Sequence, residues 1–291
     1  IKAWQDTLMT NKKNRAFLKW AGGKYRLVEQ INHHLPEAKK LVEPFVGAGS
    51  VFLNTDFSSY LLSDINPDLI NLYKILQQQP ERYIEDAQGL FTAQNNDSDA
   101  YYAMRALFNA SEDVYERAVL FLYLNRFGYN GLCRYNLSGK FNVPFGKYKA
   151  PYFPKEELYF FAEKSKKAHF VCESYEKTFS RARAGSVVYC DPPYAPISKT
   201  ANFASYAKGG FSMAEQSNLA LIAAKTAFER DIPVLISNHD TDDTRRLYAL
   251  AQLSELQVSR FISQKGNGRK KVSELLALYI KPTSRWGLNF N

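Results

Sequence analysis

The sequence predicts an α/β protein with an open, mostly parallel sheet, an antiparallel edge hairpin and a mainly helical insertion. Two observations support this fold class. Short apolar runs rich in β-branched residues alternate with segments of helical periodicity in the first and last parts of the chain. The middle of the chain shows helical spacing without intervening strand patterns. A length of 291 residues suits one large domain that carries such an insertion.

The first part, residues 13–66, alternates between helix and strand. Gly22–Gly23 precede an expected helix that runs to Leu35. Residues 41–42 indicate a short buried strand, and the glycine turn in "PFVGAGS" leads into a second expected helix. Tyr60–Asp64 then form the next strand, so this part contributes neighbouring strands of a parallel sheet.

The middle part, residues 67–151, is expected to form a helical domain that emerges from a loop of the sheet. Apolar residues recur at helical spacing in "PDLINLYKILQ" and "DVYERAVLFLYLN". The region ends in "NRFGYNGLCRYNLSGKFNVPFGKYKAPYF", which is rich in glycine, aromatic and basic residues. We therefore assign residues 13–66 and 152–280 to one sheet domain, and residues 1–12 and 281–291 to tails.

The last part returns to alternating helices and strands. Pro154 begins a helix that runs through Lys167, and "HFVC" and "SVVYC" are the strands that follow. A helix over Ser212–Arg230 precedes the strand "PVLIS". "LSELQVSRFIS" and "KKVSELLALYI" flank Gly266–Gly268, which predicts the tip of the edge hairpin.

Charge and cysteine usage narrow the class of protein. A formal net charge of +9 favours a polyanionic partner such as nucleic acid. Cys133, Cys172 and Cys190 are widely spaced, and only four histidines accompany them, so we expect no metal site and a reducing compartment. No apolar run approaches the roughly 18 residues of a membrane span, and no secretory signal is evident. We expect a cytoplasmic protein that has no membrane partner.

The stretch "EPFVGAGSVF" indicates a nucleoside site. Gly47 and Gly49 lie between a strand and an expected helix, where a ligand can approach the backbone closely. Asp64 ends the next strand, where its carboxylate can accept hydrogen bonds from ribose hydroxyls. Phe52 occupies the position of the third glycine in the dinucleotide fingerprint, which disfavours an NAD-dependent oxidoreductase and favours an adenosine without a pyrophosphate.

The stretch "VVYCDPPYAP" indicates chemistry on an amino group. Asp191 follows a buried strand, and two prolines stiffen the backbone behind it. An exocyclic amine is a poor nucleophile because its lone pair is delocalised into the ring. The Asp191 carboxylate and the Pro192 carbonyl could hold its two protons and localise that lone pair, while Tyr194 stacks on the base. Attack on a reactive methyl group would then depend on positioning and electrostatics.

"KWAGGK", "EPFVGAGSVF" and "DPPY", in this order, resemble the motifs of amino-group DNA methyltransferases. The chain is most similar to the Dam-type group, which modifies N6 of adenine in GATC, and the similarity runs from about Lys13 to Tyr279. The resemblance implies a Rossmann-like methyltransferase sheet as the catalytic domain, a helical DNA-recognition domain, double-stranded DNA as substrate and S-adenosylmethionine as the cofactor, with no metal. It leaves a host-chromosome or phage origin open, and we expect a monomer without an obligate protein partner.

The resemblance also assigns residues to the cofactor and to the target base. Those that it places at the cofactor are Trp20, Lys24, Phe45, Gly47, Gly49, Asp64, Tyr175 and Asp191. Asp191 and Tyr194 also contact the adenine, and with Pro192 they form the predicted catalytic group. Lys24 could pair with the methionine carboxylate of the cofactor, although a solvated charge at a helix start is the simpler interpretation of that residue alone.

DNA recognition requires the adenine to leave the duplex, because its N6 is already paired there. In "RFGYNGLCRYN", Tyr129, Asn130 and Leu132 could fill the vacated stack, and Arg134 could bind guanine O6 and N7. The residues that we expect at the DNA are Lys19, Arg126, Tyr129, Asn130, Leu132, Arg134, Pro144 and Lys147. Pro144 could touch a thymine methyl. Lys147 stands where the resemblance leads us to expect arginine, and lysine can keep a phosphate contact there but not a bidentate contact with a base.

Several alternatives remain open on the residues alone. The methyl acceptor could be cytosine N4, an RNA adenine or a protein glutamine. The protein could also be a DNA-binding regulator, without enzymatic activity, that retains a relic cofactor site. The loop "RFGYNGLCRYN" could be a capped helix end whose aromatic rings pack. "QKGNGRKK" could be a solvated turn or a phosphate contact, and we read "SNHD" as structural.

Overall fold

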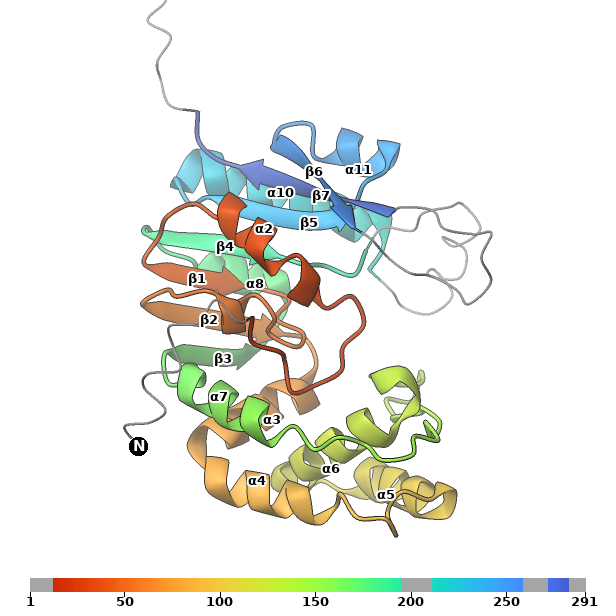
Figure 1. Cartoon of the computed structure of the whole chain (residues 1–291). Helices are drawn as coiled ribbons and strands as arrows, with labels where there is room; N and C mark the ends of the chain where they lie inside the picture. Colours follow the sequence, from red (N-terminus) through yellow and green to blue (C-terminus); the bar gives the residue numbers. More distant parts are fainter. Residues whose placement is uncertain (1–12, 195–210, 259–271, 283–291) are drawn as a thin grey trace, which may run out of the picture.

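The computed structural model describes residues 13–194, 211–258 and 272–282. Figure 1 shows a twisted sheet with helices on both faces and, below it, a group of helices that belongs to the middle of the chain. The expected tails and the hairpin tip at Gly266–Gly268 lie outside the described residues.

Seven strands form one sheet in the order β3-β2-β1-β4-β5-β7-β6. Their bounds are β1 Lys40–Glu43, β2 Ser59–Asp64, β3 Ala168–Cys172, β4 Ser186–Cys190, β5 Val234–His239, β6 Gln252–Val258 and β7 Val272–Tyr279. The first five strands are parallel, β7 is antiparallel to β5, and β6 is antiparallel to β7. This confirms the predicted α/β fold class, with the antiparallel pair at one edge.

The described helices alternate with the strands or follow one another in the insertion. The α-helices are α2 Val28–His34, α3 Pro67–Gln78, α4 Pro80–Gly89, α5 Ser98–Ala110, α6 Val114–Phe127, α7 Lys155–Ser165, α8 Tyr175–Arg181, α10 Met213–Arg230 and α11 Asp242–Leu247. Short 3₁₀ turns are η2 Lys24–Arg26, η3 Phe52–Asn54 and η4 Tyr129–Gly131. None of the helices in the described ranges is long and apolar enough to cross a membrane.

The central strands are buried on both faces, as expected for parallel strands covered by helices. Leu41 of β1 and Tyr189 of β4 pack into one core, on the side of α2, α3 and α7. Their neighbours Val42 and Cys190 pack into a second core with α8 and α10. The sheet is therefore held in place from both sides, and its carboxyl edge is a stable platform for a site.

One expected helix is absent, since the chain after the glycine turn makes only the 3₁₀ turn η3. Phe52 is fully buried there, with its ring edge-on to Tyr60 and Phe161. The Thr55 hydroxyl donates to the Val51 carbonyl (3.0 Å), and Thr55 itself is extended, so the helix cannot continue. The expected helix up to Leu35 is likewise divided into η2 and α2.

The helical region lies between β2 and β3 in the sequence. α3 packs against both α6 and α7, and the α6 helix is buried along most of its length. Asn66 caps α3 through its side chain, which accepts from the backbone of Asp68 (3.0 Å) and Leu69 (3.3 Å). The start of the insertion is thus fixed directly at the carboxyl end of β2. The proposed boundaries at residues 67 and 151 stay a prediction.

Candidate active site

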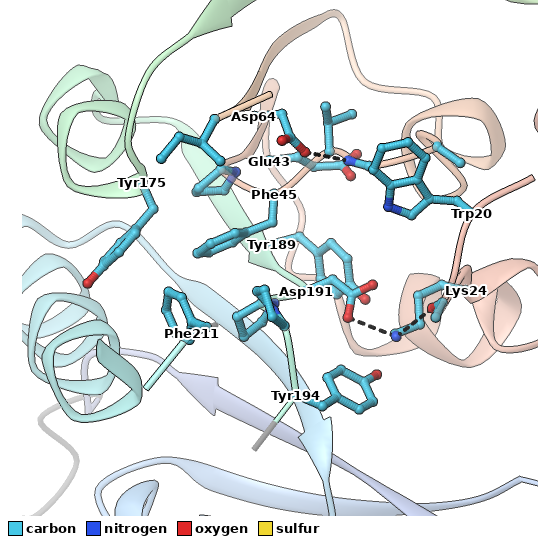
Figure 2. A pocket seen from close by; sticks show the side chains of 18 of the residues that line it. Trp20, Lys24, Glu43, Phe45, Asp64, Tyr175, Tyr189, Asp191, Tyr194 and Phe211 are labelled. Atoms are coloured by element: carbon cyan, nitrogen blue, oxygen red, sulfur yellow. Dashed lines mark hydrogen bonds and ion pairs between the residues drawn. The ribbon is translucent and has the colours of Figure 1, made fainter. Parts of the chain in front are cut away.

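A cavity of about 730 Å³ opens at the carboxyl ends of β1, β2 and β4 (Figure 2). In open α/β sheets this edge is where ligands bind. The cavity brings together the following residues that the sequence predicted at the cofactor or the base: Trp20, Lys24, Phe45, Gly47, Asp64, Tyr175, Asp191, Pro192 and Tyr194. Gly49 does not line the cavity and instead shapes the turn, at φ +73°.

Lys24 is the centre of a charged group on one wall of the cavity. Its ammonium lies 2.8 Å from Asp191 Oδ1 and 3.3 Å from Glu274 Oε1, and it donates to the Gly22 carbonyl (3.0 Å). It also lies over the Tyr194 ring, 4.3 Å from the centroid. Lys24 is 3 % exposed, so these carboxylates, rather than water, balance its charge.

The Asp191 carboxylate is also oriented by hydroxyl groups beneath it. Ser237 Oγ donates to Asp191 Oδ1 (3.1 Å), and the Tyr189 hydroxyl lies 3.0 Å from the same Ser237 oxygen. Both hydroxyl-bearing side chains are buried. This pair therefore helps to hold the Asp191 carboxylate in a fixed position.

The proline corner is braced from α10. Gln216 Nε2 donates to the Pro193 carbonyl (2.7 Å), and the Gln216 carbonyl oxygen accepts from Asn238 Nδ2 (3.0 Å). Tyr194 donates to Glu274, and its ring meets His239 edge-on at 4.4 Å between centroids. Burial, with Asp191 and Glu274 nearby, raises the pKa of Tyr194 far above its usual range, so its hydroxyl remains a donor.

Asp64 and the glycine turn form the opposite end of the cavity. Gly47 N–H donates to Asp64 Oδ2 (3.2 Å), and Asn66 N–H donates to Asp64 Oδ1 (3.0 Å). Burial raises the pKa of Asp64, while these backbone hydrogen bonds oppose the rise. The carboxylate is therefore held at the strand end in the position that the sequence predicted for a ribose ligand.

Trp20 covers the glycine turn closely. A Cβ atom at Gly47 would lie 2.9 Å from Trp20 Nε1, and Gly47 has φ +46°. Only glycine fits both the left-handed backbone and this contact. The Tyr73 hydroxyl donates to the Gly47 carbonyl (2.5 Å) and fixes the turn from α3.

Three aromatic rings line the side of the cavity near α8 and α10 (Figure 2). Phe45 stacks on Tyr175 with 5.5 Å between centroids, and Phe211 meets both rings edge-on. The Tyr175 hydroxyl accepts from Asn218 Nδ2 (2.9 Å). Burial raises the pKa of Tyr175 to about 12. This apolar wall suits a flat heterocycle, and Phe211 adds a ring that the sequence did not predict.

Glu43, at the end of β1, also lines the cavity but is 2 % exposed. Its Oε1 atom has no hydrogen-bond partner in the described part of the chain. Burial, and then the negative charge of Asp191, raise the pKa of Glu43 well above its usual value, against the effect of a backbone hydrogen bond with Phe52.

Several residues predicted to contact DNA lie together on the loop after α6. Tyr129, Asn130, Arg134 and Pro144 are exposed, and Leu132 is half-buried. Tyr129 N–H donates to the Pro144 carbonyl (2.8 Å), which joins the two sides of the loop. Arg134 Nε donates to Asn142 Oδ1 (2.8 Å), so its guanidinium is oriented before any ligand binds.

The remaining predicted DNA residues differ in their exposure. Lys147 is exposed at φ +54°. The Lys19 ammonium lies over the Tyr148 ring at 4.0 Å, and burial, followed by the Arg126 charge, lowers the pKa of Lys19. Arg126 is 8 % exposed, and its Nε donates to the Tyr152 carbonyl (2.9 Å), an arrangement that favours packing. The DNA assignment of these residues stays a prediction.

Sequence reasoning missed several residues that line the site or support it. Glu43 stands inside the quoted glycine motif without an assigned role, and Ser237 belongs to "SNHD", as does His239, which lines the cavity. Their position after apolar strands was the available signal, since strand ends in such sheets gather at the ligand edge. The described residues contain no group of three His, Cys, Asp or Glu side chains that could hold a metal ion.

Comparison with known proteins places this chain in a family. The model of the D12 class N6 adenine-specific DNA methyltransferases matches residues 20–262. The DNA adenine methylase of Vibrio cholerae serotype O1 is 63 % identical over 268 residues, which cover 92 % of this chain and 97 % of that protein. The DNA adenine methylases of Escherichia coli (61 % identical, 92 % and 96 % covered) and Serratia marcescens (60 %, 92 % and 99 %) are similar in the same way. The chain therefore belongs to the D12 class of N6 adenine-specific DNA methyltransferases and is an enzyme that methylates adenine in DNA.

Proposed function

We propose that this enzyme transfers the methyl group of S-adenosylmethionine to N6 of an adenine flipped out of double-stranded DNA, within the sequence GATC. The observation that carries the proposal is the single cavity that joins Asp64 and the glycine turn at one end to Asp191 and Tyr194 at the other. That combination suits an adenosyl cofactor and a base amine side by side.

The residues present fit such a cofactor. Asp64 is held by backbone donors at a strand end, where ribose hydroxyls could bind its carboxylate. The rings of Phe45, Tyr175 and Phe211 offer an apolar wall for the adenine. Lys24 supplies a buried cation for the methionine carboxylate. When bound, the cofactor supplies an electrophilic methyl group on a sulfonium centre.

The chain's own residues then act on the target amine. Asp191 and the Pro192 carbonyl would accept hydrogen bonds from the two N6–H groups, which would localise the nitrogen lone pair. Asp191 would also take up the one proton that N6 loses on methylation. Ser237 and Lys24 hold the Asp191 carboxylate in position. The chemistry thus rests on positioning and fixed charge.

The assay is methyl incorporation into two duplexes that differ only in one GATC site, followed by digestion with methylation-sensitive restriction enzymes. We expect incorporation only into the GATC duplex, and none with Asp191→Ala enzyme that retains its thermal transition. Equal incorporation into both duplexes would remove the sequence assignment. Transfer to cytosine or to RNA in a parallel panel would redirect the substrate.

A further inference from the structure

Two segments that lie far apart in the sequence meet at one buried side chain. Asn125 lies in the last turn of α6 and is 2 % exposed. Its Oδ1 accepts from the Lys19 N–H (2.8 Å), and its Nδ2 donates to the carbonyls of Lys19 (2.8 Å) and Gly131 (3.1 Å). One amide group therefore joins the segment before the cavity to the loop over residues 128–147, the recognition loop.

The backbones of these two segments are in close contact. Gly131 has φ +62°, and a Cβ atom there would lie 2.2 Å from the Cβ of Lys19. Glycine permits both the left-handed backbone and the close approach. The separation between Lys19 and the recognition loop is therefore set by backbone packing and by the Asn125 amide, and long side chains do not adjust it.

The side chain of Lys19 is joined to the same loop. Its ammonium lies 4.0 Å from the centroid of the Tyr148 ring, and the Tyr148 hydroxyl accepts from the Asn130 N–H (2.9 Å). Asn130 precedes Gly131 and also has a left-handed backbone, at φ 53°. Lys19 is thus connected to the recognition loop twice, at its backbone through Asn125 and at its ammonium through Tyr148.

This arrangement bears on how a base sequence is read. The residues that we expect at the DNA come from both segments, with Lys19 on one and Tyr129, Asn130 and Leu132 on the other. Groups on two segments read one duplex only if their separation matches that of the base edges in the groove. Asn125 is buried, so it affects that match through the segments that it joins.

We propose that Asn125 is a positioning residue for sequence discrimination, which keeps Lys19 and the recognition loop at the separation that the recognition sequence requires. This inference rests on the proposed function, and it concerns the choice of sequence rather than the transfer of the methyl group. Asn125 acts through the backbone of Lys19 and of Gly131. Its loss should therefore reduce the preference between duplexes.

The test measures kcat/KM of the full chain on a GATC duplex and on three duplexes, each substituted at one of the other three positions. The variants are Asn125→Ala, Lys19→Ala and the double variant. A smaller fraction of folded enzyme lowers kcat/KM on all duplexes alike. The ratio of the cognate to the substituted value therefore reports discrimination and is insensitive to stability.

We expect Asn125→Ala to lower this ratio about tenfold at a position that Lys19→Ala also affects. At that position the double variant should discriminate no worse than Lys19→Ala alone, because Asn125 has no side chain left to position there.

Asn54→Ala is the matched control. The Asn54 amide binds the same segment in the same way, since its Oδ1 accepts from the Asn14 N–H (2.7 Å) and its Nδ2 donates to the carbonyls of Asn14 (2.9 Å) and Ser50 (2.8 Å). These three bonds do not involve the recognition loop. Asn54→Ala should therefore keep the wild-type ratio.

An unchanged ratio in Asn125→Ala, an equal loss in Asn54→Ala, or additive losses in the double variant would overturn the proposal. If Asn125→Ala does not fold, Asn125→Asp enters the same comparison, because it keeps the acceptor for the Lys19 N–H and loses both donors. Equal kcat/KM of the wild-type enzyme on all duplexes would overturn the GATC assignment together with this inference. A failure confined to the variants overturns this inference alone.

Discussion

The position of the Asp191 carboxylate depends on the side chains that surround it. Asp191 is bound from one side by Lys24 and from below by Ser237, which in turn contacts Tyr189. Each group restricts the carboxylate to one orientation. The remaining acceptor capacity of Asp191 is thereby available to the proposed substrate amine.

Ser237→Ala should lower kcat about tenfold, equivalent to about 1.4 kcal/mol, since it removes the hydroxyl that donates to Asp191. Steady-state kinetics on a GATC duplex measures the change. Tyr189→Phe, which removes only the more distant hydroxyl, is the matched control and should change kcat much less. An unchanged kcat in Ser237→Ala would show that Ser237 serves packing alone.

Glu43 should make the free energy of unfolding decrease as pH rises, which is opposite to the effect of a carboxyl group whose pKa is lowered in the folded protein. Its pKa is raised in the folded protein from a value of 4.5, so the folded state holds more protons than the unfolded state above that pH. Its contribution therefore favours folding at low pH and is lost as pH rises toward the folded pKa, by at most about 1.4 kcal/mol per pH unit. Urea unfolding of wild type and Glu43→Gln at several pH values checks this. Parallel curves for the two proteins would contradict it.

At the residue scale, the sequence identified site residues that belong to local motifs, where the residue type and its position in the motif are enough to predict a role. Asp64, Trp20, Lys24 and Asp191 were predicted from motifs, and they meet in one cavity. Glu274 was not foreseen. It lies on β7, far from Lys24 in the sequence, and the two residues meet only because of the way the strands are ordered in the sheet. Pairings of that kind depend on the tertiary fold rather than on local pattern.

At the scale of elements, one ionic contact fixes the helical region to the loop that follows it. Arg117 of α6 contacts Asp68 of α3 through two nitrogens, each at 2.9 Å from a different oxygen. The Tyr135 hydroxyl donates to Asp68 Oδ2 (2.6 Å). The same loop reaches the end of β2, where Asn66 Nδ2 donates to the Cys133 sulfur (3.4 Å).

Arg117→Met should destabilise the protein by about 3 kcal/mol, because it leaves the mostly buried Asp68 carboxylate without its cation. Thermal or denaturant unfolding measures the loss. Adding Asp68→Asn should recover part of it, since the unpaired charge is then removed. A cost that is no smaller in the double variant would show that packing of the Arg117 stem dominates.

Elements with strong periodicity were predicted well, while short connections were not. The apolar spacing of α6 predicted its helix, and the Ser212 capping box matches the expected start of α10. The helix expected after Gly49 was wrong. There, burial of Phe52 and the hydroxyl of Thr55 end the turn, and neither effect is visible in a pattern of apolar residues.

At the scale of the whole molecule, the excess of positive charge should govern DNA binding. With a net charge of +9, we expect log affinity to fall linearly with log salt concentration, by about 0.9 for each phosphate contacted. Lys147→Gln should reduce that slope by about one and weaken all sequences alike. Fluorescence anisotropy at a series of salt concentrations measures the slope. An unchanged slope would remove Lys147 from the phosphate contacts.

The fold class could be predicted as a whole because alternating strands and helices leave few topologies. The position of β7 between β5 and β6 could not be predicted, because either strand of a hairpin can pair with the neighbouring strand of the sheet. The exposed cluster of Tyr129, Arg134 and Pro144 was anticipated by composition, whereas the burial of Arg126 depends on the Tyr152 segment that covers it.

The contact between Asn66 and Cys133 has a practical consequence for engineering new specificities. A chimaera could replace the loop that contains Cys133 and keep the native end of β2. Asn66 would then face a residue other than Cys133, although the backbone of Asn66 also donates to Asp64. Loop exchange would then disturb the Asp64 end of the cavity. Transplanted segments should therefore begin at Asn66, so that the graft carries its own anchor.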